Sequence, residues 1–139
     1  MSMKKLLTIG KLAQASHVNV ETIRFYERKG ILTQPKKIGA FRYYPWEFVK
    51  KIHFIKRSQE LGFTLRESKE LLDLKIKDQA RCSDVLIKTE EKIHEIDQKI
   101  EDLQKMKRSL KGLANCCHDM NQPLSDCPIL ECFVERKNI

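Results

Sequence analysis

The chain has 139 residues, of which 41% are hydrophobic, and its formal net charge is +8. Its length predicts one compact unit or one small domain with an appendage, and its five glycines and four prolines exclude collagen-like and low-complexity chains. Residues 1–75 carry 16 basic and 7 acidic side chains, net +9, whereas residues 76–139 carry 11 and 12, net −1. The first half therefore has the charge expected of a domain that binds a polyanion.

The apolar stretches are too short for a membrane protein. None approaches the roughly 20 apolar residues that a membrane-spanning helix needs. Lys11 interrupts the apolar stretch after Lys4 and Lys5, and no cleavage site of small residues follows, so a signal peptide is not indicated. We expect a soluble, cytoplasmic protein without a membrane partner. In such a reducing compartment, five cysteines indicate metal binding or redox sensing rather than a disulfide framework.

Two short amphipathic helices are predicted near the start of the chain. Thr8 can cap the first, over residues 9–15, and Asn19 can cap the second, over residues 20–28. Residues 16–18 form the turn between them, with His17 where glycine is often found. So tight a turn is typical of a helix-turn-helix, although an ordinary helical hairpin has the same pattern. The basic charge of this half favours the helix-turn-helix.

The next segment predicts a small β wing and two more helices. Residues 36–44 combine a Gly-centred turn with aromatic residues and three cations, as a wing would. Pro45 can open a helix over residues 46–61, and a capping box from Thr64 to Glu67 begins another that ends near Leu74. Both helices should pack on the first two, and the core positions of the longer one are Phe48, Val49, Ile52 and Ile55.

A coiled-coil pattern follows the linker that begins at residue 76. Alternating spacings of three and four define a seam, whose members are Leu86, Thr89, Ile93, Ile96, Ile100, Leu103, Lys107 and Leu110. A helix with this stripe needs a partner, so we predict a homodimer. The expected regions are a DNA-binding-type domain over 1–75, a linker and coiled-coil helix over 76–114, and an irregular tail over 115–139 with Pro123 and Pro128.

The cysteines are placed at the two ends of the long predicted helix. Cys82 and Cys117 are separated by about 50 Å at ~1.5 Å per helical residue, so one chain cannot join them. An antiparallel dimer would bring Cys82 of one subunit beside Cys117 of the other, and Cys127 could fold back as a third ligand. The remaining candidate ligands are Cys116, His118 and Cys132, of which the two cysteines could equally be small buried hydrophobes.

Three thiolates without a carboxylate form a soft site. Such a site suits Hg(II), Cd(II), Pb(II), Zn(II) or Cu(I) rather than magnesium or calcium. The residues alone leave the choice among these ions open.

The sequence resembles the MerR family of bacterial metal-responsive regulators over nearly its whole length. The similarity rests on residues 8–10, 18–30, 41–44 and 61–65, and on Cys82, Cys117 and the run 127–130. The resemblance implies a mostly α fold: an N-terminal winged helix-turn-helix, a long antiparallel coiled-coil dimerisation helix and a short C-terminal metal-binding tail. It also implies a repressor on promoter DNA that distorts the DNA when metal binds, so that RNA polymerase engages both promoter elements.

The helix-turn-helix motif and the charge together indicate which residues meet DNA. We expect contacts from Arg24, Tyr26, Arg42 and Tyr43, with Val20 and Glu21 near base edges at the start of the recognition helix.

Within the family, Cys82 argues against copper sensors, which resemble this chain but carry serine there. Mercury sensors have three cysteines at positions that match Cys82, Cys117 and Cys127, so Hg(II) is the first expectation. The Cys116-Cys117 doublet resembles zinc sensors, and the loop from Cys117 to Cys127 is a residue longer than the usual mercury pattern, so Zn(II), Pb(II) and Cd(II) remain alternatives.

Three other classes of protein fit the sequence less well. A thiol or zinc enzyme would be expected to show a Cys-x-x-Cys motif, metalloprotease histidine spacing or a glycine-rich phosphate loop, and the sequence has none of these. A metal-free coiled-coil adaptor would not explain the basic first half. An iron-sulfur sensor would need a tighter cluster of four cysteines. We therefore expect a regulator and not an enzyme.

Overall fold

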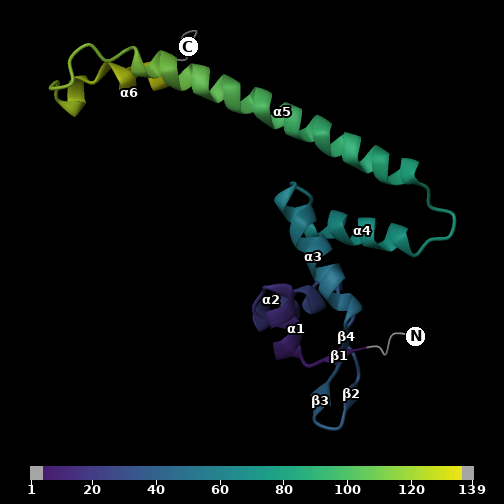
Figure 1. The fold of residues 1–139 in the computed structure, drawn as a ribbon. Helices are drawn as coiled ribbons and strands as arrows, with labels where there is room; N and C mark the ends of the chain where they lie inside the picture. The colour runs from purple at the N-terminus through teal and green to yellow at the C-terminus, as the bar shows by residue number, and fades with distance from the viewer. Residues whose placement is uncertain (1–4, 136–139) are drawn as a thin grey trace. The chain divides into compact units, whose positions relative to one another are not determined.

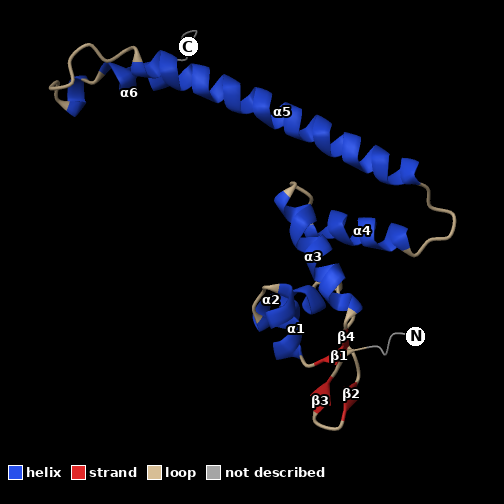
Figure 2. Cartoon of the chain, viewed as in Figure 1, coloured by secondary structure: helices blue, strands red, loops and turns tan. Residues whose placement is uncertain are grey.

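The computed structural model describes residues 5–135 and is mostly helical (Figures 1 and 2). Contacts divide the chain into one compact unit that ends at Lys88 and a second that begins at Thr89. The first unit contains the small strands and four helices, and the second contains most of the long helix and the C-terminal segment. The predicted fold class is confirmed. Among the described residues, no helix is both long and apolar enough to cross a membrane.

The first two helices are α1 (Ile9–Ser16) and α2 (Val20–Arg28), close to the predicted bounds. Thr8 and Asn19 are their N-caps, as predicted. The Thr8 hydroxyl accepts a backbone N–H at 3.4 Å, and the Asn19 carboxamide oxygen accepts the Thr22 N–H at 2.8 Å. Because each cap satisfies a donor that the helix leaves free, the two helix starts are fixed by local sequence.

The turn between α1 and α2 places His17 in the left-handed region, with φ 57° and ψ 41°. Its backbone N–H is directed at the carbonyl oxygens of Ala13 and Gln14, which ends α1. This conformation explains why glycine is common at such a turn. The His17 ring stacks on the ring of His53 in a later helix, with centroids 6.5 Å apart.

The predicted wing is a hairpin of β2 (Lys37–Ile38) and β3 (Phe41–Arg42), paired antiparallel with Lys37 opposite Arg42. Gly39 occupies the turn with φ 65°, which a residue with a side chain rarely adopts. The Arg42 guanidinium donates to the carbonyl oxygen of Pro35 at 2.5 Å. This contact fixes the wing to the segment that precedes it.

A second strand pair was not predicted. It joins β1 (Leu6–Leu7) to β4 (Tyr44–Pro45) in antiparallel register. The prediction that Pro45 opens a helix is wrong, because Pro45 lies in β4. Proline has no N–H for the pairing, and the Trp46 N–H instead donates to the Lys5 carbonyl at 3.0 Å.

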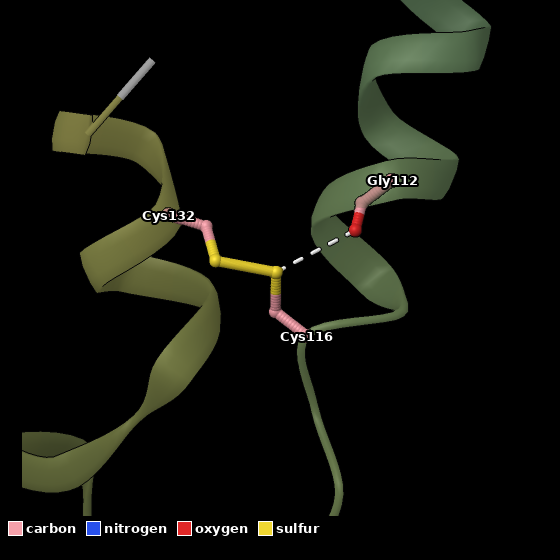
Figure 3. Close-up of a disulfide and its surroundings, with 3 residues drawn as sticks. All are labelled: Gly112, Cys116 and Cys132. Atoms are coloured by element: carbon pink, nitrogen blue, oxygen red, sulfur yellow. Dashed lines mark hydrogen bonds between the residues drawn. A yellow bond between two sulfur atoms is a disulfide. The ribbon is translucent and has the colours of Figure 1, made fainter. Parts of the chain in front are cut away.

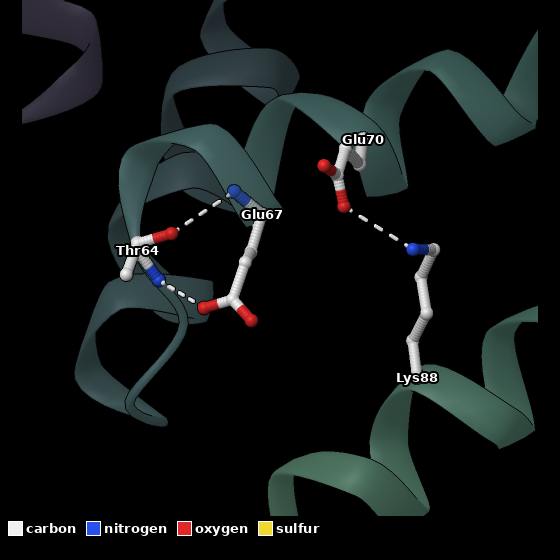
Figure 4. A network of polar contacts seen from close by, with 4 residues as sticks. All are labelled: Thr64, Glu67, Glu70 and Lys88. Carbon is white, nitrogen blue, oxygen red and sulfur yellow. Dashed lines mark hydrogen bonds and ion pairs between the residues drawn. The ribbon is translucent and has the colours of Figure 1, made fainter.

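Two helices complete the first unit, α3 (Glu47–Glu60) and α4 (Leu65–Lys75). The predicted capping box starts α4: Thr64 Oγ1 accepts the Glu67 N–H at 3.1 Å, and the Glu67 carboxylate accepts the Thr64 N–H at 2.8 Å (Figure 4). The core lies between α1, α2, α3 and the strands. The four predicted core residues of α3 are all buried there, together with Leu7, Leu12, Ala13, Ile23, Tyr26, Leu32 and Tyr44.

The long helix is α5 (Cys82–Ala114), a continuous run of 33 residues. Near its start, the Lys88 ammonium lies 3.2 Å from the Glu70 carboxylate of α4 (Figure 4). The six apolar side chains of the seam are 39% to 61% exposed in a single copy of the chain. A row of this kind is left in contact with water unless another helix covers it.

The segment after α5 is more ordered than predicted. It contains a 3-10 turn, η1 (Leu124–Asp126), and a helix, α6 (Pro128–Glu135). The expectation of an irregular tail is therefore wrong over these residues. Pro128 is the first residue of α6, where its missing N–H has no helical partner to lose and its fixed φ suits the helix.

Candidate functional site

A basic cleft lies where the start of α1, α2 and the wing meet. Its volume is about 590 Å³, and its lining residues include three cations and no carboxylate. The full set is Thr8, Ile9, Gly10, Arg24, Gln34, Lys37, Ala40, Phe41, Arg42 and Tyr44. Because the first amides of a helix and nearby cations both attract negative charge, this cleft can hold an anion such as a phosphate group.

Three of the residues predicted to meet DNA lie on α2: Glu21 and Arg24 are exposed, and Val20 is half-buried. Tyr43 lies between β3 and β4 and is also half-buried. Phe25 is also exposed, with the charged ends of Arg28 and Lys29 at 5.9 and 5.6 Å from its ring centroid. The sequence reasoning missed Phe25. It also missed Lys37, although the cationic composition of the wing was a signal for it.

Tyr26 is mostly buried, although it lines a shallow hollow beside Glu21 and Phe25. Its side chain is only 4% exposed, it packs in the core with Ile23, and its hydroxyl lies 3.5 Å from the Gln59 side-chain oxygen. Burial raises the pKa of Tyr26 above its ordinary value. Its packing supports α2 from behind, and a contact between Tyr26 and DNA stays a prediction.

Tyr44 and Glu27 connect the base of the wing to α2. The Tyr44 hydroxyl donates to Glu27 Oε2 at 2.9 Å, while the buried Glu27 Oε1 has no hydrogen-bond partner in the described part of the chain. Burial first, and then the hydrogen bond and the negative charge of Glu27, raise the pKa of Tyr44 from 10.0 to about 12. The positive charges of Arg24 and Arg42 act in the opposite direction.

The five cysteines fall into two groups. Cys82, Cys117 and Cys127 are free thiols: Cys82 is exposed at the first position of α5, and the other two are half-buried. Cys116 and Cys132 form a disulfide that links the end of α5 to α6 (Figure 3). The three free cysteines are the three predicted as principal metal ligands. The two additional cysteine candidates are correspondingly not available as thiolates in this form, which leaves His118 as the additional ligand candidate.

The three free cysteines are not gathered into one metal site among the described residues. Over residues 5–135, no group of three or more His, Cys, Asp or Glu side chains comes together as a metal site. The length of α5, about 50 Å at ~1.5 Å per residue, separates Cys82 from the other two.

Comparison with known proteins identifies the class. Residues 7–75 match the family model described as MerR HTH family regulatory protein, and residues 49–113 match the model described as MerR, DNA binding. The fold and these matches define a helix-turn-helix transcription regulator. The chain belongs to the MerR family, as its sequence predicted.

Individual relatives are similar over most of the chain. The mercuric resistance operon regulatory protein of Bacillus cereus is 43% identical over 129 residues, which cover 92% of this chain and 97% of the relative. The structure of MerR from Bacillus megaterium MB1 in complex with a mercury(II) ion has 42% identity and a TM-score of 0.70, covering 91% of this chain and 98% of that one. The structure of PbrR691 from Ralstonia metallidurans CH34 in complex with lead(II) covers the same shares at 29% identity, with a TM-score of 0.83. These relatives are regulators and not enzymes.

Proposed function

We propose that the chain is a mercury(II)-responsive regulator that binds promoter DNA as a homodimer. Residues 1–75 bind the DNA, residues 76–114 dimerise, and residues 115–139 contribute to metal sensing. The observation that carries the proposal is the division of the five cysteines into free and bonded ones. Cys82, Cys117 and Cys127 are free thiols, and the other two form a disulfide with each other. A regulator with a three-sulfur sensor needs these three thiols free.

The DNA-binding part of the proposal rests on the basic cleft. A phosphate seated there would meet Arg24, Lys37 and Arg42 from two directions, and the first amides of α1 from a third. With the cleft holding the backbone, the start of α2, with half-buried Val20 and exposed Glu21, would lie toward base edges in the major groove.

The dimer part rests on the exposed seam of α5. In an antiparallel pair, the seam of each helix would cover the seam of the other. Each end of the pair would then bring Cys82 of one subunit close to Cys117 and Cys127 of the other subunit. Each dimer would then have two equivalent metal sites.

The metal is proposed from the number of sulfurs. Three thiolates satisfy Hg(II), whereas Zn(II) usually takes four ligands. The mercury relatives support the same choice. Pb(II) is the second candidate, because a structural neighbour with a TM-score of 0.83 was determined with lead(II). Cd(II) and Zn(II) are the remaining alternatives, and Zn(II) would need a ligand beyond the three sulfurs.

Without metal, the bound dimer would repress. With metal, it would distort the promoter so that RNA polymerase engages both promoter elements and transcription begins. The metal would therefore act as an inducer that changes the geometry of the DNA-bound dimer.

In vitro transcription tests the proposal. The DNA sequence that the protein binds is first selected from a random pool. It is placed between the two promoter elements of the template, and Hg(II), Pb(II), Cd(II) and Zn(II) are then added in separate reactions. We expect Hg(II) to activate transcription at a lower concentration than the other ions. Cys82→Ser should abolish this activation while leaving DNA binding intact. His118→Ala should retain activation by Hg(II). Activation by zinc or lead in preference to mercury, or loss of the mercury response in His118→Ala, would contradict the assignment of the metal.

A further inference from the structure

The Cys116–Cys132 disulfide closes a loop that contains two of the proposed metal ligands. The two cysteines are 16 positions apart, and both Cys117 and Cys127 lie between them. Figure 3 shows the bridge between the turn after α5 and the side of α6. Any change in this bridge therefore changes the freedom of the segment that carries both ligands.

We propose that this disulfide is a reversible redox switch that sets the metal affinity of the sensor. The inference rests on the proposed function, because it assigns a regulator to the same metal site. In the disulfide form, α6 is held at the end of α5 and the loop with Cys117 and Cys127 is already closed. In the dithiol form, the metal itself must close that loop.

The direction of the effect follows from chain entropy. Bringing two ligands of a flexible loop to one ion removes conformational freedom, and a crosslink that encloses the loop removes much of that freedom before the ion arrives. The disulfide form should therefore bind metal more tightly. For a closed loop of this size, the chain-entropy model gives an upper bound of roughly a hundredfold, and we expect about tenfold.

The surroundings of the bridge suit a reversible reaction. Cys116 and Cys132 are both half-buried, so a small thiol can reach them, and Glu131 and Phe133 beside Cys132 are exposed. The Cys116 sulfur also lies 3.6 Å from the Gly112 carbonyl oxygen, which can accept a hydrogen bond from the thiol once the bridge is open. Cys116 therefore has a bonding partner in either form: Cys132 when the disulfide is closed, and the Gly112 carbonyl when it is open.

The reaction balances as thiol–disulfide exchange. One cysteine thiolate attacks a low-molecular-weight disulfide, forms a mixed disulfide and releases one small thiol. The second cysteine thiolate attacks the cysteine sulfur of the mixed disulfide, forms the Cys116–Cys132 bond and releases the second small thiol. Two electrons and two protons move from the protein to the small disulfide, and the reverse reaction opens the switch. DNA-binding regulators work where thiols are kept reduced, and disulfides there are usually transient or redox-sensing.

Cd(II) binding to the full-length protein tests the proposal. The disulfide form and a form reduced with a phosphine, which is then removed without air, are titrated in competition with a thiol-free chelator, and the cadmium-thiolate absorbance is recorded. Mass spectrometry verifies the two forms by the difference of two hydrogens per chain. The expected result is about tenfold tighter binding by the disulfide form. Equal affinities, tighter binding by the reduced form, or failure of the disulfide to form in any mixture of reduced and oxidised glutathione would overturn the proposal.

Matched variants separate this inference from the proposed function. A Cys116→Ser, Cys132→Ser double variant keeps the three proposed ligands, and it should bind like the reduced wild type whether or not it has met the phosphine. Cys132→Ser alone leaves the Cys116 thiol free. If this single variant binds Cd(II) more tightly than the double variant, Cys116 is a metal ligand. That result would overturn the proposal of a redox switch. If Cys82→Ser binds Cd(II) as tightly as the wild type in both forms, the proposed three-sulfur site fails, whatever the disulfide does.

Discussion

Arg24 of α2 and Arg42 of β3 line the same basic cleft, although they belong to different elements of the first unit. If DNA phosphate occupies the cleft, removal of either guanidinium should weaken binding. We expect Arg24→Ala, Arg42→Ala and Lys37→Ala each to weaken promoter binding and to lower its salt slope by about one, as the loss of a phosphate contact does. A loss of about 1–3 kcal/mol confined to one DNA sequence would instead mark Arg24 as a base contact. Fluorescence anisotropy over a series of salt concentrations measures both quantities.

The control for this prediction is Lys99→Ala, which removes an exposed cation of α5 far along the sequence from the cleft. It should leave binding and salt slope unchanged. Promoter binding that is unaffected by both Arg24→Ala and Arg42→Ala would show that DNA is bound elsewhere.

The Tyr44–Glu27 contact predicts a loss of stability at high pH. The unfolded chain ionises this tyrosine near pH 10.0, whereas the folded chain does so near pH 12. The tyrosine contributes fully to stability below pH 10.0, and its contribution is lost as the pH rises toward 12, because the unfolded state releases the proton first. Tyr44→Phe should flatten this decline in the free energy of unfolding, measured by urea denaturation at each pH. Some decline should remain, because burial also raises the pKa of Tyr26. A decline in Tyr44→Phe equal to that of the wild type would refute the explanation.

The capping box of α4 predicts a stability effect that involves neither DNA nor metal. Thr64→Ala removes the acceptor of the Glu67 N–H and should lower the free energy of unfolding by about 1 kcal/mol. Thr64→Ser keeps a hydroxyl at the same position and should lie close to the wild type. Thermal unfolding followed by circular dichroism compares the three proteins, and equal midpoints for Thr64→Ala and Thr64→Ser would show that the hydroxyl contributes nothing.

The exposed seam of α5 predicts a dimer that charge can separate. Ile96→Asp combined with Ile100→Asp would place carboxylates in the apolar interface, at several kcal/mol each. We expect this variant to be monomeric in analytical ultracentrifugation at low micromolar concentration. Gln98→Asp with Gln104→Asp adds the same charge at exposed positions outside the seam and should remain dimeric. A seam variant that stays fully dimeric would place the interface on another face.

The placement of the metal ligands predicts complementation between two inactive variants. Cys82→Ser and a Cys117→Ser, Cys127→Ser double variant should each bind no metal at the proposed sites. In their heterodimer, one site combines an intact Cys82 with an intact pair of loop cysteines, while the other has lost all three sulfurs. Half of the wild-type metal capacity should therefore return, measured on heterodimers isolated with two different affinity tags. A heterodimer that binds no more metal than its parents would mean that each site is built within one chain.

Signals that act within one turn of a helix could be predicted from the sequence. Thr8, Asn19 and Thr64 were predicted as caps, and each accepts a backbone N–H of the helix that follows it. Contacts between residues far apart in the sequence could not be predicted from such local signals. The pairing of β1 with β4 involves only two residues on each strand, which is too short for a periodic pattern.

Two features had signals in the sequence. Tyr26 lies three positions after the buried Ile23 on α2, so helical spacing placed both on one face. The tail was expected to be irregular, whereas α6 begins at Pro128, because the first position of a helix accepts proline. The division of the five cysteines into three free thiols and a disulfide depends on how α6 returns to α5, and spacing alone does not determine this.

The pairing of β1 with β4 also has a consequence for how the first unit folds. Leu7 pairs with Tyr44, so α1, α2 and the wing all lie inside one long backbone loop between two very short strands. Closing this loop costs conformational entropy, and the cost is smaller when the helices inside the loop have already formed. We therefore expect the helices to form early and the strand pair to close late. A chain emerging from the ribosome cannot complete this pairing until β4 has been synthesised. We therefore expect the base of the wing to become ordered after α1 and α2.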